Sequence, residues 1–254
     1  MQIIKGRFSI VYIGDCLRVM KSLKQAQFDF GISDPPYNVD AKKVIGMKQR
    51  RHYKEIKETQ RTVVEYNDLM DQEQYYDWCD QWFTELSRVS RYGCFTCGFT
   101  NIGYWTWVHE LYYATWVHKN SPSRSYASMF NWQEPIIVYG KYDRKFPYDV
   151  FEVPTKSGFN LSEEEKKLHH PHPKPIKLWK MLIEFARPKS VIDPFLGSGT
   201  TAEACEELGI PCVCMEKNEE YIDDINLRIK WGMAKYRPKT KVKGLRNYAA
   251  KVAE

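Results

Sequence analysis

The fold is decided by the stretch Val191-Ile192-Asp193-Pro194-Phe195-Leu196-Gly197-Ser198-Gly199-Thr200-Thr201. A short apolar run leads into a bend with two glycines, and an amphipathic segment follows up to Leu208. Glycine tolerates positive φ and lets a ligand approach the backbone closely. The stretch therefore predicts a strand, a ligand-binding turn and a helix.

An acidic residue follows this unit at an informative distance. The next apolar run, 212–215, ends at Glu216, which lies 19 residues after Gly197. In nucleotide-binding βαβ units, an acidic side chain about 20 residues after the glycines binds the ribose hydroxyls. The bend matches neither Gly-x-Gly-x-x-Gly nor a P-loop, so phosphate binding is disfavoured. We therefore expect an adenosine-containing cofactor here.

The rest of the chain alternates short apolar runs with amphipathic segments, which is typical of α/β proteins. This pattern predicts one domain over residues 1–254, with a mixed, mostly parallel sheet and helices on both of its faces. The predicted strands are 8–13, 28–33, 93–97, 115–117, 135–139, 190–193 and 212–215, and the predicted helices are 16–23, 72–90, 101–113, 175–186, 200–208 and 219–236.

A second motif, Asp34-Pro35-Pro36-Tyr37-Asn38, directly follows the apolar run 28–33. Each proline locks its own φ, and Pro35 holds Asp34 in an extended conformation. A rigid carboxylate and rigid carbonyls next to an aromatic ring suit the exocyclic amine of a nucleobase. The alternative interpretation is a proline turn that simply ends the strand.

Four motifs, in this order, resemble those of the β-class S-adenosylmethionine-dependent DNA amino-methyltransferases. They are Gly14-Asp15-Cys16, Asp34-Pro35-Pro36-Tyr37, the His-Pro-x-x-Lys-Pro motif at 170–175, and the cofactor motif within 191–216. The catalytic motif precedes the cofactor motif, as in the β class. Protein glutamine methyltransferases instead carry Asn-Pro-Pro-Tyr after the cofactor loop. The resemblance implies a Rossmann-like class I methyltransferase fold.

The resemblance also implies roles for individual residues. Asp34 and the Pro35 carbonyl would accept hydrogen bonds from the target amine, and Tyr37 would stack on a base flipped out of the duplex. The implied catalytic residues are Asp34, Pro35, Pro36 and Tyr37. The implied cofactor-binding residues are Asp15, Cys16, Asp34, Lys174, Asp193, Phe195, Gly197, Ser198, Gly199, Thr200 and Glu216.

We expect methylation of adenine N6, because members of the family that modify cytosine N4 more often carry Ser at the position of Asp34. Cytosine N4 methylation is the main alternative. RNA as the substrate and a non-catalytic nucleic-acid-binding subunit are the others. The resemblance implies S-adenosylmethionine as cofactor and duplex DNA as partner, and it is compatible with a homodimer.

The charge distribution favours a polyanionic partner. The chain carries a net charge of +6, with +4 in the basic insertion 39–66 and +8 in the tail 228–254, so the remaining residues carry −6. Basic segments on an acidic body suit contact with DNA phosphates. Solvated surface charge is the alternative. The segment 141–168 occupies the position of the target-recognition region of the family and is short.

Several classes of protein are disfavoured. The seven cysteines have scattered spacings, which predicts a reducing compartment and no disulfide framework. Cys94 and Cys97 have no second pair of the same spacing, so we expect no metal site. No apolar run approaches the ~18 residues that a membrane-spanning helix needs, and no secretory signal is expected. These features predict a cytoplasmic protein, and the family resemblance implies a prokaryotic or phage-infected cell.

Overall fold

The structure, a computed structural model, describes residues 1–38, 70–120, 123–124, 130–142, 148–155 and 161–238. Within these ranges, one nine-stranded sheet has the order β1-β2-β11-β10-β3-β4-β8-β5-β9. Its five central strands are parallel, which confirms the predicted mixed, mostly parallel sheet. They are β2 (Ser9–Ile13), β11 (Cys212–Glu216), β10 (Val191–Asp193), β3 (Phe28–Ser33) and β4 (Ser90–Thr96).

Antiparallel strands lie on both sides of this parallel centre. On one edge β1 (Gln2–Lys5) pairs with β2, and on the other side β8 (Gln133–Gly140) pairs with β4. Because β8 runs opposite to β4, its first residues lie beside the last residues of β4. The remaining strands are β5 (Tyr112–Val117) and β9 (Val150–Glu152) of the sheet, and the separate pair β6 (Ser123–Arg124) and β7 (Phe130–Asn131).

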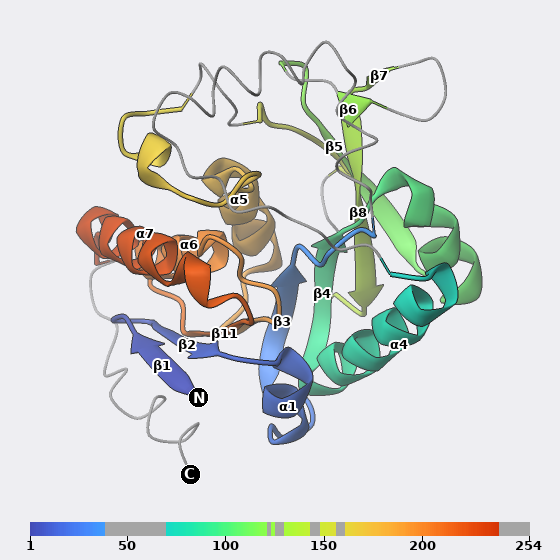
Figure 1. The fold of residues 1–254 in the computed structure, drawn as a ribbon, viewed down its shortest axis with the longest axis horizontal. Coiled ribbons are helices and arrows are strands. Elements are labelled where there is room, and N and C mark those ends of the chain that lie inside the picture. The colour runs from blue at the N-terminus through green and yellow to red at the C-terminus, as the bar shows by residue number, and fades with distance from the viewer. Residues whose placement is uncertain (39–69, 121–122, 125–129, 143–147, 156–160, 239–254) are drawn as a thin grey trace.

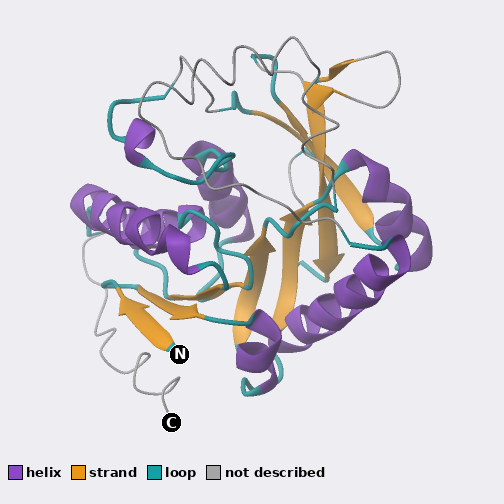
Figure 2. Cartoon of the chain, in the orientation of Figure 1, coloured by secondary structure: helices purple, strands orange, loops and turns teal. Residues whose placement is uncertain are grey.

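Helices cover both faces of the sheet, as predicted (Figures 1 and 2). One face packs against α1 (Cys16–Lys21) and α4 (Gln72–Val89). The other packs against α5 (Ile176–Ala186), α6 (Thr200–Leu208) and α7 (Ile222–Lys235). Short turns of 3-10 helix are η1 (Phe99–Asn101), η4 (Glu165–Lys167) and η5 (Glu219–Tyr221).

The α4 helix shows how local chemistry and packing agree. Asp71 caps its start by accepting a hydrogen bond from the Glu73 N–H at 2.9 Å. The apolar residues recur at helical spacing and are buried, as expected for a core stripe. Trp82 is fully buried, and its ring lies 5.1 Å from that of Phe95 on β4. Burial of such a side chain contributes about 1.5–3 kcal/mol to stability.

The order of the strands creates a switch point between β3 and β10. These strands are parallel neighbours, with Val191 opposite Phe30 and Ile192 opposite Gly31. The next described helix after β3 is α4, on one face, whereas β10 leads to α6 on the opposite face. Ligands of open α/β sheets bind beyond the carboxyl ends of the strands at such a point.

The predicted helix over 101–113 was wrong beyond Val108. The chain forms η1 and one π-helical turn, η2 (Tyr104–Val108), and then enters β5 at Tyr112. Glu110 has a φ of 53°, a left-handed conformation that ends the helix. The strands β1 and β9 were not predicted, because β1 is a largely exposed edge strand and β9 has only three residues.

The charged segments are described only in part. The basic insertion 39–66 and residues 239–254 lie outside the described residues. Residues 228–235 belong to α7, where Arg228 and Lys235 bind the buried carboxylate of Glu203 at 2.7 and 2.8 Å. The prediction that the tail 228–254 contacts DNA stays a prediction, since most of the tail lies outside the described residues. Among the described helices, none is long and apolar enough to cross a membrane.

Candidate active site

The two motifs separated by about 160 residues in the chain open into one cleft. The link is a 2.6 Å hydrogen bond from the Ser33 hydroxyl, at the end of β3, to Asp193 Oδ1, at the end of β10. Both Asp34 and Gly197 line this cleft. The proline corner (Asp34-Pro35-Pro36-Tyr37) and the glycine bend (residues 197–199) therefore meet in space.

Three groups hold one oxygen of the Asp34 carboxylate. Asp34 Oδ1 accepts hydrogen bonds from the Tyr37 hydroxyl at 2.7 Å and from Thr96 Oγ1 at 2.5 Å. The Lys174 ammonium lies 3.0 Å from the same oxygen. All three of these contacts, from described residues, are made to Oδ1, and the Asp34 side chain also lines the cleft.

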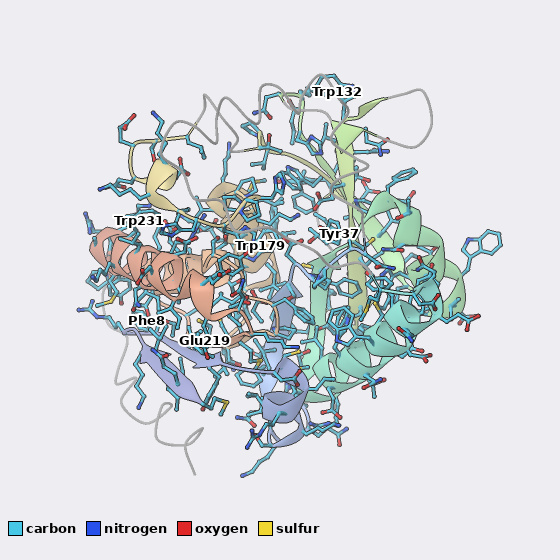
Figure 3. The ribbon with its side chains drawn as sticks, in the orientation of Figure 1. Phe8, Tyr37, Trp132, Trp179, Glu219 and Trp231 are labelled. Carbon is cyan, nitrogen blue, oxygen red and sulfur yellow. The ribbon has the colours of Figure 1, made fainter. Side chains whose placement is uncertain are left out.

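Lys174 joins the proline corner to β8. Its Nζ lies 2.7 Å from Glu134 Oε1 and 3.0 Å from the Tyr37 hydroxyl, and it sits over the Tyr37 ring. Burial lowers the pKa of Lys174, but the Asp34 and Glu134 carboxylates outweigh burial and raise it, so the ammonium stays charged. Burial and the same two carboxylates raise the pKa of Tyr37, so its hydroxyl stays protonated. Figure 3 shows Tyr37 beyond the ends of β3 and β4.

The glycine bend adopts conformations that L side chains rarely adopt. Gly197 has a φ of 56° and Gly199 a φ of 101°. A Cβ atom on Gly197 would lie 3.1 Å from His170 Nε2, and one on Gly199 would lie 3.1 Å from the Ile225 Cα. The bend therefore approaches the His-Pro segment on one side and α7 on the other.

Glu216 lies beside the bend at the end of β11. Its carboxylate accepts hydrogen bonds from the Gly197 and Asn218 N–H groups, each at 2.7 Å, and burial raises its pKa to about 7. The Gly14 N–H donates to the Glu216 carbonyl at 2.8 Å. Pairing of β2 with β11 thus places Asp15 and Cys16 next to Glu216.

A buried carboxylate of α7 holds the His-Pro segment over the bend. Asp224 is fully buried and accepts hydrogen bonds from the His169 and His170 N–H groups at 2.9 Å. The His172 N–H donates to His170 Nδ1 at 3.2 Å, so the proton of the neutral His170 ring is on Nε2. Burial lowers the pKa of His170 to about 4, which keeps the ring neutral.

The predicted residues fall into three groups. Those that line the cleft are Asp34, Lys174, Asp193, Phe195, Gly197, Ser198 and Thr200. Asp15, Cys16, Gly199 and Glu216 surround the bend, while Pro35, Pro36 and Tyr37 form the rigid corner. The carboxylate of Asp193 accepts hydrogen bonds from the Ser33 and Thr201 hydroxyls and from the Phe195 N–H. Burial raises its pKa to about 7. These contacts favour a structural contribution from Asp193.

Sequence reasoning missed Thr96, Glu134 and Asp224. Thr96 could have been found as a polar residue at the end of a predicted strand. Glu134 could have been found as a lone acidic residue directly before the apolar run 135–139. Asp224 could not be distinguished in this way, because charged residues are ordinary within an amphipathic helix. Among the described residues, no group of three His, Cys, Asp or Glu side chains could hold a metal ion, and all seven cysteines are free and buried.

Comparisons with known proteins agree with this arrangement. The type II methyltransferase M.ScaI of Streptomyces caespitosus is 24% identical, with 84% of this chain and 79% of that protein covered. The type II methyltransferase M.HinfI of Haemophilus influenzae is also 24% identical, with 85% of this chain and 67% of that protein covered.

Solved structures share the fold. The cytosine-N4-specific PvuII DNA methyltransferase superimposes with a TM-score of 0.61 at 14% identity, covering 98% of this chain and 91% of that one. The M1.HpyAVI–SAM complex superimposes with a TM-score of 0.53 at 21% identity, and the match covers 86% of this chain and 98% of that one. The class I methyltransferase fold is thus confirmed. Residues 28–227, which include both the proline corner and the glycine bend, match the N6_N4_Mtase family of DNA methylases, and the chain belongs to this family.

Proposed function

We propose that the protein is a DNA adenine-N6 methyltransferase that transfers a methyl group directly to the exocyclic amine of a flipped adenine. The observation that carries this proposal is the Asp34 carboxylate, which lines the same cleft as the glycine bend and is held through Oδ1 alone by Tyr37 and Thr96. An aspartate at this corner, rather than a serine, supports adenine over cytosine.

The cofactor is S-adenosylmethionine, and the residues of the cleft fit it. Gly197 and Ser198 line the cleft, and the positive φ of Gly197 presents backbone there without a side chain, as a close approach to a ligand requires. Glu216 offers carboxylate oxygens suited to ribose hydroxyls, next to Asp15 and Cys16 for the adenine. The sulfonium supplies an already activated methyl group. The protein therefore has to supply positioning and a matched electrostatic environment.

The proline corner supplies the acceptors for the target amine. Asp34 Oδ2 and the Pro35 carbonyl accept its N–H groups, which localises the nitrogen lone pair toward the methyl group. The Tyr37 ring offers a stacking surface, although its hydroxyl is held by Asp34 and Glu134 at 2.7 Å. A base inside a duplex cannot reach this corner, so it has to flip out at a cost of a few kcal/mol.

The DNA contacts, the single domain over 1–254, a homodimer and the cytoplasmic location are further parts of this proposal. The insertion 39–66 and the last residues of the tail are the candidates for phosphate contacts, because their positive charge is not matched within their own segments. The segment 141–168 is the candidate for target recognition. Part of it, β9, pairs with β5 at the sheet edge.

A nucleoside analysis tests the proposal. The protein is incubated with methyl-labelled S-adenosylmethionine and duplex DNA, and the DNA is digested to nucleosides and separated. We expect the label in N6-methyldeoxyadenosine. Label in N4-methyldeoxycytidine alone would refute the adenine assignment, and label in RNA but not in DNA would replace the proposed substrate.

The Asp224→Asn variant should weaken cofactor binding. The amide keeps one acceptor but points N–H hydrogens at the N–H donors of 169 and 170, so the His-Pro segment loses its anchor on α7. Leaving a buried donor unpaired costs about 1–3 kcal/mol. We expect a similar loss in unfolding free energy and an about tenfold weaker Kd for S-adenosylmethionine by calorimetry. Asp223→Asn, on the exposed side of the same helix, is the control, and equal behaviour of both variants would contradict the anchoring.

Cofactor affinity should fall on acidification below pH 7. Burial raises the pKa of Glu216 to about 7, and only the ionised carboxylate accepts from both ribose hydroxyls. Binding therefore releases a proton below this pH, and Kd should rise by up to about tenfold per pH unit. Asp193 titrates in the same range, and Glu216→Gln separates the two residues. Calorimetry between pH 5.5 and 8 should show a flatter profile for the variant, and an unchanged profile would exclude Glu216 as the cause.

A further inference from the structure

The Lys174 ammonium lies between two carboxylates at one end of the cleft. Its Nζ is 2.7 Å from Glu134 Oε1 and 3.0 Å from Asp34 Oδ1. The side chains of Lys174, Glu134 and Asp34 are only 12%, 20% and 25% exposed, so water screens these charges weakly. One ammonium between two carboxylates leaves this cluster with a net charge of −1.

Glu134 competes with Asp34 for the same donors. The Tyr37 hydroxyl lies 2.7 Å from Glu134 Oε1 as well as 2.7 Å from Asp34 Oδ1. Two of the three groups that occupy Asp34 Oδ1 are therefore shared with Glu134, and only Thr96 is not. The sharing follows from topology, because the antiparallel strand β8 begins where β4 ends and so carries Glu134 to the proline corner.

We infer that Glu134 is a positioning residue of the proposed reaction, which binds the Lys174 ammonium and so keeps the Asp34 carboxylate available to the target amine. This inference rests on the proposed function. Without Glu134, Lys174 would pair with Asp34 alone and neutralise it. With Glu134, the cluster keeps one negative charge, which matches the single positive charge of a sulfonium.

Single-turnover rates at saturating S-adenosylmethionine test the inference. Glu134→Gln should reduce the rate of methyl transfer about 100-fold, the size of effect that follows loss of one preorganised electrostatic group. The Kd for the cofactor should stay within about threefold, because the effect is on the acceptor of the amine. Glu134→Asp should recover part of the rate. The matched control is Glu184→Gln, whose side chain is exposed on α5 and should leave the rate unchanged.

The double variant Glu134→Gln with Lys174→Met makes the sharper test. Removal of the ammonium frees Asp34 again, so the double variant should be at least about tenfold faster than Glu134→Gln alone. A double variant that is no faster, or a Glu134→Gln protein within threefold of the wild-type rate, would overturn the inference.

Thermal unfolding of the cofactor-free proteins supplies a readout that does not depend on activity. Lys174→Met alone leaves two carboxylates facing each other without their cation, so it should lower Tm more than the double variant does. Additive shifts in Tm would mean that the two side chains are not coupled, and they would overturn the inference. A wild-type protein that labels no DNA would refute the proposed function instead, and the unfolding comparison would still decide the coupling.

Discussion

The Asp34→Ala protein should transfer methyl groups about 1,000-fold more slowly than wild type, the range expected for loss of a positioned acceptor of a reacting group. The variant removes the carboxylate that the amine needs, while the glycine bend, Glu216 and Asp224 stay intact. We therefore expect the Kd for S-adenosylmethionine to change by less than about fivefold. Single-turnover labelling of DNA and calorimetry with the cofactor measure the two effects separately.

Two further variants make this prediction specific. Asp34→Asn keeps the size of the side chain but loses the charge that binds Lys174, so its rate should also fall strongly. Asp77→Asn, on the exposed face of α4, is the control and should leave the rate unchanged. Methyl transfer by Asp34→Ala at more than a tenth of the wild-type rate would show that the amine is bound elsewhere.

The Gly199→Val protein should lose both stability and cofactor binding. Gly199 has a φ of 101°, and its Cβ would lie 3.1 Å from the Ile225 Cα and 3.3 Å from the Arg228 Cβ. A β-branched residue at positive φ and the extra atoms against α7 together cost about 2–4 kcal/mol of unfolding free energy. Shifting α7 also moves Asp224 and the His-Pro segment, so the Kd should weaken at least tenfold. Denaturant unfolding and calorimetry measure these effects.

Gly103 is a control that shows whether the expected losses in stability and cofactor binding depend on the position of the substituted glycine. Gly103 has a φ of −60°, and a Cβ there would meet no atom within 4 Å. Gly103→Ala should leave unfolding free energy within about 0.5 kcal/mol of wild type or raise it, because alanine restricts the unfolded chain. A Gly199→Val protein that binds the cofactor as tightly as Gly103→Ala would contradict the close approach of the bend to α7.

Elements with local start and stop signals were predicted with their observed bounds. The run 28–33 is β3, since the prolines that follow cannot continue a ladder. The helix 200–208 is α6, which begins after Gly199 and ends at Gly209, whose φ is 72°. The helix predicted over 101–113 failed because the left-handed Glu110 and the stacking of Tyr104 on Tyr76 are not visible in helical periodicity.

Local chemistry alone identified the proline corner, the glycine bend and Glu216, because each motif contains its own conformational constraint, and the resemblance of the ordered motifs indicated the family. Folding alone brought Glu134 and Thr96 to Asp34, and Asp224 to the His-Pro segment. The reason is physical: Glu134 lies 97 residues after Tyr37 and Asp224 lies 55 after His169, so local sequence does not show which partner either residue contacts. The contact between Glu134 and Lys174 beside Asp34 depends on strand order, which places β8 antiparallel beside β4.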